Sequence, residues 1–338
     1  QQHHQQHHQQ HHQQHHQQHQ QRHHQHGQQQ PAYTTIPFQR IARSRSSDVD
    51  STLKHRLTVI FTTSPVQSNP STAMVEDVLG GFSRVRGLAT CPKIIVCDGV
   101  KVGESNKFRS GCVTKEKADA YTEYIDCLAT LVKSATNSFE NSTLIRLEKR
   151  GGFGNAVKAA LELVETPFVM VVQHDRSFMR SFPLTKVLDA METDTSLKYV
   201  GLQTTSTLNY AHKMIVRFKI NLTPRNVCGV SLIPMLVWYD STHICSVAHY
   251  KRFVFGARQL TKGNFIEADL GQAQIKDLRT NGIASHAEYG SFLLSDMEER
   301  AVGHVDGRCY DEVQWKKTHS TNADANTSTN TNANINAN

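Results

Sequence analysis

The sequence lacks an apolar run long enough to cross a bilayer. Its longest, Val227–Tyr239, is interrupted by Ser231 and Pro234 and is shorter than the roughly 20 residues that a spanning helix needs. We therefore expect no membrane-spanning segment, and no signal peptide is visible. The expected location is therefore cytoplasmic by default. Because the chain begins at Gln1 rather than Met, the secretory pathway is the expected location if an N-terminal anchor precedes it.

Cysteine pairs and basic stripes are also missing. The seven Cys are odd in number and contain no C-x-x-C pair, which favours reduced core cysteines over a disulfide framework. The formal net charge is +7, but the positive residues are scattered rather than arranged in a stripe with interleaved aromatic residues. Nucleic acid is therefore not an expected partner.

The common phosphate-binding and nucleophile motifs are absent as well. The loop Arg150-Gly-Gly-Phe-Gly154 matches neither the dinucleotide fingerprint nor the P-loop. No G-x-S-x-G elbow occurs, and Cys97 lies inside a predicted strand. Any catalytic site must therefore use another set of residues.

Apolar residues are nearly absent from both ends of the chain. Residues 1–30 are almost entirely Gln and His, and residues 319–338 are mostly Asn, Thr, Ala and Ser. Such segments cannot bury enough apolar surface to offset the entropy of ordering. We predict a disordered tail and linker at 1–49, a single domain at 50–318, and a second disordered tail at 319–338.

The predicted domain begins with alternating apolar strands and amphipathic helices. Continuous apolar runs occur at 57–61, 94–97, 143–147 and 168–172, separated by helical patterns at 72–82, at 118–133 and after Gly154. This order predicts an α/β fold with a mostly parallel central sheet and helices on both faces. Right-handed crossovers place the carboxyl ends of all four strands at one edge, where such sheets bind ligands.

Polar residues follow each of these four strands, and together they predict a ligand site. Asp175 is positioned to hold a divalent metal beside a diphosphate, although a surface Asp paired with Arg176 fits the local sequence too. The predicted edge residues are Thr63, Ser64, Pro65, Asp98, Lys149, Arg150, Gln173, His174 and Asp175.

Several runs resemble the inverting glycosyltransferase family 2, which has the GT-A fold. They are Asp98-Gly99, the helix start Gly-Phe-Gly-Asn155, and the apolar strand that runs into Gln-His-Asp175. The runs at 62–65, 96–99, 172–176, 238–243 and 265–267 are similar to little-characterised family-2-like proteins of algae, protists and large viruses. The general resemblance covers about residues 55–180, and the narrower one reaches about residue 295.

The resemblance implies a GT-A (Rossmann-like) nucleotide-sugar-binding domain. Its implied reaction moves a sugar, with inversion, from a uridine or guanosine diphosphate sugar to a hydroxyl of a carbohydrate, protein or lipid acceptor, with Mn²⁺ or Mg²⁺. Asp98 matches the base-binding Asp, and Asp175 matches the second Asp of Asp-x-Asp. Gln173 stands in place of the first Asp, and an amide binds a metal less tightly than a carboxylate.

The remaining site residues are expectations of the same kind. The implied donor-binding set is Thr63, Ser64, Pro65, Asp98, Lys149, Arg150, Gly152, Asn155, Gln173 and His174. Glu267-Ala-Asp269 is the nearest match to the acidic motif that carries the catalytic base, and either carboxylate fits that role or that of a helix cap. Trp238, Tyr239, Asp240 and His243 either shape an acceptor pocket or form a core cluster, and His286 is a candidate third metal ligand.

Two other functions remain open at this point. A sugar-phosphate nucleotidyltransferase shares the sheet edge and the metal, but normally has a Gly-rich loop after the first strand, where this chain has Thr-Thr-Ser-Pro65. A catalytically inactive carbohydrate-binding protein is favoured by the loss of the first Asp in Asp-x-Asp.

Overall fold

The computed structural model describes residues 33–36, 52–135, 137–258 and 265–305. Apart from Tyr33–Ile36, the two tails expected at 1–49 and 319–338 lie outside the described residues. The strands are β1 (Tyr33–Ile36), β2 (Leu57–Thr63), β3 (Lys93–Cys97), β4 (Lys101–Val102), β5 (Cys112–Val113), β6 (Ser142–Leu147), β7 (Phe168–Gln173), β8 (Tyr199–Gly201), β9 (Arg225–Val227), β10 (Val230–Pro234), β11 (His243–Ser246) and β12 (Ser291–Leu294).

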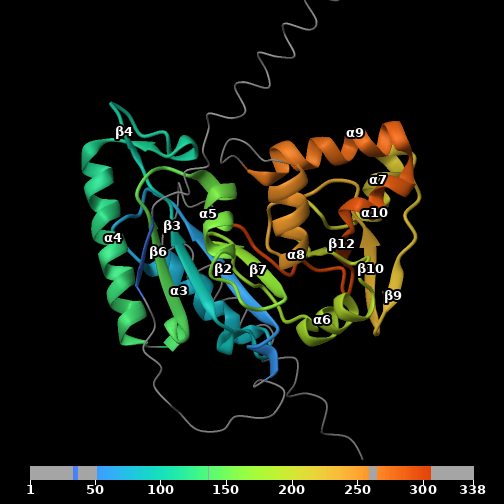
Figure 1. Ribbon diagram of the computed structural model, residues 1–338, viewed down its shortest axis with the longest axis horizontal. Coiled ribbons are helices and arrows are strands. Elements are labelled where there is room, and N and C mark those ends of the chain that lie inside the picture. The colour runs from blue at the N-terminus through green and yellow to red at the C-terminus, as the bar shows by residue number, and fades with distance from the viewer. Residues whose placement is uncertain (1–32, 37–51, 136, 259–264, 306–338) are drawn as a thin grey trace, which may run out of the picture. The chain divides into compact units, whose positions relative to one another are not determined.

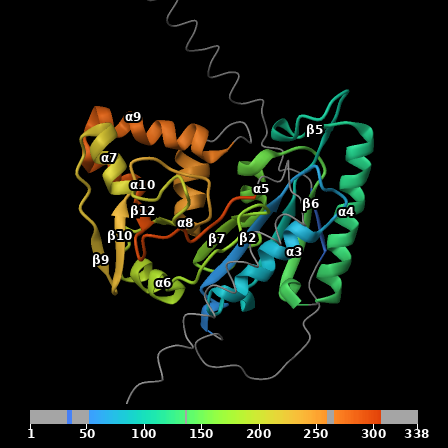
Figure 2. The same cartoon turned by 180° about the vertical axis from the view of Figure 1, so that it is seen from behind.

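The helices lie between these strands (Figures 1 and 2). The α-helices are α3 (Ala73–Gly80), α4 (Lys115–Ser134), α5 (Gly152–Leu161), α6 (Leu184–Thr193), α7 (Tyr210–Phe218), α8 (Val247–His249), α9 (Gln272–Asn281) and α10 (His286–Tyr289). The segments η5 (Tyr250–Ala257) and η6 (Glu267–Gly271) are π-helical. Short 3₁₀ turns are η1 (Gly81–Arg84), η2 (Leu88–Thr90), η3 (Phe108–Ser110), η4 (Asn137–Phe139) and η7 (Ile283–Ser285).

Ten strands form one sheet in the order β1-β6-β3-β2-β7-β11-β8-β12-β10-β9. The central block β6-β3-β2-β7 is parallel throughout. The strands β1, β10 and β11 run against it, whereas the other strands of this sheet run with it. The expected α/β fold class, with a mostly parallel central sheet, is therefore confirmed.

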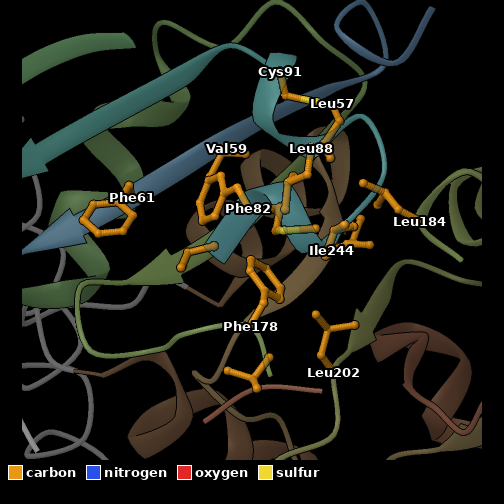
Figure 3. Close-up of a cluster of buried hydrophobic side chains, with 14 of the residues drawn as sticks. Leu57, Val59, Phe61, Phe82, Leu88, Cys91, Phe178, Leu184, Leu202 and Ile244 are labelled. Atoms are coloured by element: carbon orange, nitrogen blue, oxygen red, sulfur yellow. The ribbon is translucent and has the colours of Figure 1, made fainter. Parts of the chain in front are cut away.

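The two faces of the sheet carry separate hydrophobic cores, because successive side chains of a strand point to opposite faces. Leu57, Val59 and Phe61 of β2 pack with α3, α4 and α6 on one face (Figure 3), whereas Ile60 packs with α5, α7 and η5 on the other. The strands of the central block are almost wholly buried, as expected for a parallel sheet covered on both sides. Helices on both faces are thus observed.

The structure differs from the sequence-based expectation on both sides of the central block. Tyr33–Ile36, expected within the disordered N-terminal segment, forms β1 and pairs antiparallel with β6. The short strands β9, β11 and β12 were not expected from the sequence pattern. Among the described residues, no helix combines the length and apolar composition required to cross a membrane.

Candidate functional site

The carboxyl ends of the four central strands meet at one edge, as the sequence predicts. The backbone N–H of Asp98, after β3, donates to the Thr63 carbonyl of β2 (2.9 Å). The N–H of His174, after β7, donates to the Thr62 carbonyl (3.0 Å). The loops that follow β2, β3 and β7 are therefore fixed against one another by the ladder itself.

Asp98 holds the loop that leads from β6 into α5. Its Oδ1 accepts hydrogen bonds from the N–H groups of Gly99 (2.9 Å) and Gly151 (2.6 Å), and its Oδ2 accepts one from Gly152 (2.9 Å). Burial raises the pKa of Asp98, and these three N–H groups together with Arg150 oppose the rise. Asp98 thus shapes the loop beside which the resemblance places the nucleotide base, and base binding itself stays a prediction.

This loop and the first turn of α5 carry four other predicted donor-binding residues. Gly152 has φ 74°, a conformation that favours glycine, and the Asn155 amide donates to the Gly151 carbonyl (3.0 Å). Lys149 is exposed, and Arg150 is half-buried. Their side chains are thus available to an anion, while the backbone around them is held by Asp98.

Thr63 and His174 lie in a buried network beneath the edge. The Thr63 hydroxyl is 2.7 Å from the Tyr124 hydroxyl and 2.8 Å from His174 Nδ1, to which the Ser64 N–H also donates (3.3 Å). Burial lowers the pKa of His174, so the ring is neutral, and because Nδ1 accepts from Ser64, its proton lies on Nε2. Pro65 is also buried. These residues support the site from below.

Asp175 faces a histidine that the sequence analysis did not single out. Its Oδ2 lies 3.3 Å from Nε2 of His304, and its Oδ1 is buried without a hydrogen-bond partner. Burial alone would raise the pKa of Asp175, but the His304 hydrogen bond, the electrostatic interaction with His174 and the charge of Arg176 hold it below its ordinary value. The anionic carboxylate is thus favoured here.

Backbone hydrogen bonds set the position of His304. The N–H groups of Gly303 and Val305 donate to the carbonyls of Ser177 and Asp175, both at 2.8 Å. His304 follows the last strand by several residues and stands in no periodic pattern, so no local signal marks it. It approaches Asp175 only because the chain returns across the carboxyl edge after β12.

Glu267 joins this group from the opposite side. Arg176 lies 3.9 Å from Asp175 (Nε to Oδ1), and although burial lowers the pKa of Arg176, the charges of both Asp175 and Glu267 raise it. The charge of Glu267 thus acts on Arg176 as that of Asp175 does. Glu267 is tied to the same edge through Asp240 and Gln173, and its joint action with Asp175 stays a prediction. Asp269 is exposed, and its side chain makes no hydrogen bond or ion pair within the described part of the chain.

Asp240 binds Glu267 through a reciprocal pair of hydrogen bonds. The Glu267 N–H donates to Asp240 Oδ2 (2.9 Å), and the Asp240 N–H donates to Glu267 Oε2 (3.2 Å). The Gln173 amide donates to the Asp240 carbonyl (2.6 Å), so Gln173 links β7 to this pair. Burial raises the pKa of Asp240 to about 8.

Aromatic stacking joins the two sides of the edge. The Phe153 ring in α5 stacks on Phe265, with centroids 5.6 Å apart. Phe265 precedes Glu267 by two residues, so this contact brings the loop held by Asp98 toward the acidic segment. Both Phe153 and Phe265 belong to runs that carry the family resemblance, but neither was predicted as a site residue.

The expected acceptor residues are divided between the core and the surface. Trp238 and His243 are 0% exposed. The His243 Nε2 is 2.6 Å from the Tyr250 hydroxyl, and its ring stacks on Tyr199 with centroids 4.5 Å apart. Burial lowers the pKa of His243 to about 4. Contrary to the acceptor-pocket expectation, these two residues are core residues, whereas Tyr239 is half-buried and Asp240 contacts Glu267.

His286 lies at the other edge of the sheet. Its Nε2 bonds the Ser291 carbonyl (2.8 Å), and Ser291 opens β12 beside Tyr199, the first residue of β8. Through β11, Tyr199 is level with the first residues of β7, whereas Asp175 follows the last one. The structure therefore does not bring His286 to Asp175, and His304 occupies the place expected for it.

Comparisons with known proteins do not define a family for this chain. No protein-family model and no curated protein match the chain. A structure of residues 1–349 of S. aureus TarS in complex with UDP-GlcNAc is similar over 77% of this chain and 60% of that one, with 14% identity and a TM-score of 0.42. A mannosyltransferase from Pyrobaculum calidifontis, in complex with GDP-Man and Mn²⁺, is similar over 58% of this chain and 46% of that one, with 14% identity and a TM-score of 0.36.

These similar structures are longer than the region they share with this chain. The chain spans 60% of the TarS 1–349 structure and 36% of a longer TarS structure, which has a TM-score of 0.39. The similarity is one of backbone structure at 14% sequence identity. It assigns no role to the residues at the carboxyl edge of the sheet.

Proposed function

We propose that this chain is a glycosyltransferase that moves a sugar, with inversion, from a nucleoside-diphosphate sugar to an acceptor hydroxyl. The observation that carries the proposal is that Arg176 and His304 lie against Asp175 at the carboxyl edge of β7, and that Glu267 is tied to the same edge through Asp240 and Gln173. This edge supplies a metal-binding carboxylate, a cation and a second carboxylate, which are the three parts that displacement of a diphosphate requires.

Asp175 and His304 fit a divalent cation. The buried Oδ1 of Asp175 has no hydrogen-bond partner, and a carboxylate with a neutral imidazole is a donor set that Mn²⁺ accepts. No cluster of three or more His, Cys, Asp or Glu side chains suited to a metal occurs within the described residues, so the other ligands would be donor phosphate oxygens or water. A cation there would offset the negative charge of the departing diphosphate.

Glu267 is the proposed general base. It takes the proton from the acceptor hydroxyl as the new bond forms between that oxygen and the anomeric carbon, while the bond from the anomeric carbon to the diphosphate oxygen breaks. Arg176, which lies against Asp175, stabilises the diphosphate charge that develops. We assign the base to Glu267 rather than Asp269 because only Glu267 is tied to the buried edge through Asp240.

Asp240 positions the base. Its two hydrogen bonds to Glu267 fix the backbone at 267 and one carboxylate oxygen, leaving the other oxygen of Glu267 for an acceptor hydroxyl. Because the raised pKa of Asp240 keeps it protonated at neutral pH, it adds no second negative charge beside the base. The candidate base is therefore oriented without like-charge repulsion.

The test separates donor binding from chemistry. Thermal unfolding is recorded with UDP, GDP, UDP-GlcNAc and GDP-Man, each with Mn²⁺ or EDTA. A donor at about 100 times its Kd stabilises the fold by about 2.7 kcal/mol. Donor hydrolysis and transfer are then compared for wild type, Glu267→Gln and the matched control Asp269→Asn.

We expect Glu267→Gln to keep the thermal shift and to lower the rate by about 10²–10⁴-fold, while Asp269→Asn stays near wild type. No shift with any nucleotide would refute the proposal. A shift with no turnover in the wild type would favour the inactive binding protein instead.

A further inference from the structure

The segment around α7 has an unusual charge pattern. Between Asp194 and Asp240 the chain contains no Asp or Glu. The same stretch contains Lys198, Lys213, Arg217, Lys219 and Arg225. It is therefore a cationic stretch within the part of the chain that the structure describes.

Exposed apolar side chains gather in the same place. Ile215, Val216 and Ile220 are 42%, 59% and 36% exposed, and they make up three of the eight exposed large hydrophobic residues of the described chain. The inner face of α7 is already packed, because Tyr210 and Met214 are buried and the Tyr210 hydroxyl accepts a hydrogen bond from the Leu236 N–H (2.9 Å). The outer apolar residues are thus not needed to hold the helix on the domain.

Three cations beside these apolar residues have no acidic partner within the described residues. Lys213 donates to the Ser206 carbonyl (2.9 Å), Arg217 lies over the Phe218 ring (5.1 Å), and Lys219 is exposed. By contrast, Lys198 caps the carbonyls of Ala287 and Glu288, and Arg225 pairs with Asp194. Lys213, Arg217 and Lys219 therefore present their charge to an external anion.

We propose that residues 210–220 form a docking surface that lies on an anionic lipid membrane. Apolar side chains interleaved with Lys and Arg match the boundary between acyl chains and anionic headgroups, where the apolar groups enter and the long cationic side chains reach the headgroups. The nine residues of α7 are far too few to span a bilayer, so the helix lies on the surface. Because this stretch contains no Asp or Glu, no carboxylate within it repels the anionic headgroups.

The docking surface lies close to the candidate base. Burial raises the pKa of Tyr239 and Glu267 raises it further, whereas Arg217 lowers it. The Tyr210 ring at the start of α7 lies 6.5 Å from the Tyr239 ring, centroid to centroid. The next residue, Asp240, is hydrogen-bonded to Glu267. Docking through α7 would hold the carboxyl edge beside the membrane, where a lipid-borne acceptor is in reach. This last consequence rests on the proposed function, whereas membrane docking does not.

The test measures cosedimentation of the full chain with vesicles of phosphatidylcholine alone and of phosphatidylcholine with phosphatidylglycerol. The variants are the apolar triple Ile215→Ser/Val216→Ser/Ile220→Ser and the charge triple Lys213→Gln/Arg217→Gln/Lys219→Gln. The matched controls are Val102→Ser/Ile283→Ser, at residues 59% and 60% exposed, and Lys101→Gln/Lys107→Gln/Arg109→Gln. All variants keep both tails, so any binding by the tails is common to them, and circular dichroism checks the fold.

We expect the wild type and both controls to bind the anionic vesicles. Each Lys or Arg near the surface contributes about fivefold, so the charge triple should bind about a hundredfold more weakly, and the apolar triple should also bind more weakly. The proposal is overturned if the wild type does not bind, or if the α7 variants bind no more weakly than the controls. A dimer in light scattering that only the apolar triple disrupts would also overturn it, by naming a second copy as the occupant. Because lipid binding is read without a sugar donor, failure of the transferase proposal leaves this result unaffected.

Discussion

Asp240→Asn provides a sharp test of the chemistry beneath the candidate base. Asp240 is 3% exposed, and its Oδ1 is buried without a hydrogen-bond partner. Burial raises its pKa from an ordinary 3.8 to about 8, and the nearby Glu267 charge adds to the rise, although N–H groups oppose it. An Asn side chain keeps the shape and can accept from the Glu267 N–H through its oxygen, but it has no proton to lose.

The sign of the effect follows from proton binding. Between about pH 4 and pH 8 the folded state holds the Asp240 proton and the unfolded state has released it, so the free energy of unfolding falls as pH rises, by about 1.4 kcal/mol per pH unit. Below pH 6.5 the lowered pKa values of His243 (about 4) and His249 (about 3) produce the opposite slope. Lys93, whose pKa burial lowers to about 8, adds an opposite slope as the pH approaches 8. Because wild type and Asp240→Asn share Lys93 and the histidines, the difference between their slopes isolates Asp240, which removes about 2 kcal/mol from pH 6.5 to 8.

The assay is urea unfolding at several pH values across that window. Wild type should lose about 2 kcal/mol more between pH 6.5 and 8 than Asp240→Asn does, while Asp126→Asn, on the exposed side of α4, should keep the wild-type slope. Parallel slopes for wild type and Asp240→Asn would show that Asp240 is already ionised at neutral pH. Asp240 would then place a second negative charge beside Glu267, contrary to the role proposed for it.

Two other substitutions test the scaffold of the site. Gly99→Ala should destabilise the fold by about 1–3 kcal/mol and weaken donor-induced stabilisation, because a Cβ there would lie 2.3 Å from the Lys149 carbonyl carbon; an unchanged denaturant midpoint would contradict it. Arg180→Gln should lower the free energy of unfolding by about 3–5 kcal/mol, because the Arg180 guanidinium donates hydrogen bonds to both Asp296 carboxylate oxygens at 2.7 and 2.8 Å. It should also weaken Mn²⁺-dependent stabilisation by loosening the segment that carries His304, and equal Mn²⁺ effects in variant and wild type would refute that link.

The central block could be predicted because its signal is local. The runs at 57–61, 94–97 and 168–172 are mostly apolar on both faces, and the run at 143–147 is apolar except for Thr143 and Arg146. The observed strands extend these four runs by no more than two residues at either end. A strand covered on both sides needs no alternation, and each run ends in polar residues. Right-handed connections then place those polar residues at one edge, which is where the structure has them.

Residues whose roles depend on distant partners could not be assigned in this way. Trp238 and His243 are typical of a sugar-binding surface when considered alone, yet the Tyr250 hydroxyl and the Tyr199 ring make them core residues. His304 becomes a partner of Asp175 only through backbone hydrogen bonds from a segment far along the chain. The position of His286 likewise depends on distant residues. Its partner Ser291 pairs with Tyr199, and this register places His286 at the edge of the sheet opposite Asp175.

The antiparallel strand β11 explains why the second half of the chain reaches the site at all. A parallel strand would bring its incoming loop to the amino edge of the sheet, away from Asp175. Because β11 runs against β7, its first residue, His243, pairs with Val171 near the end of β7. The polar run before it therefore arrives beside Gln173, whose amide holds the Asp240 carbonyl. One reversed strand thus brings Asp240, and through it Glu267, to the carboxyl edge of the parallel strands.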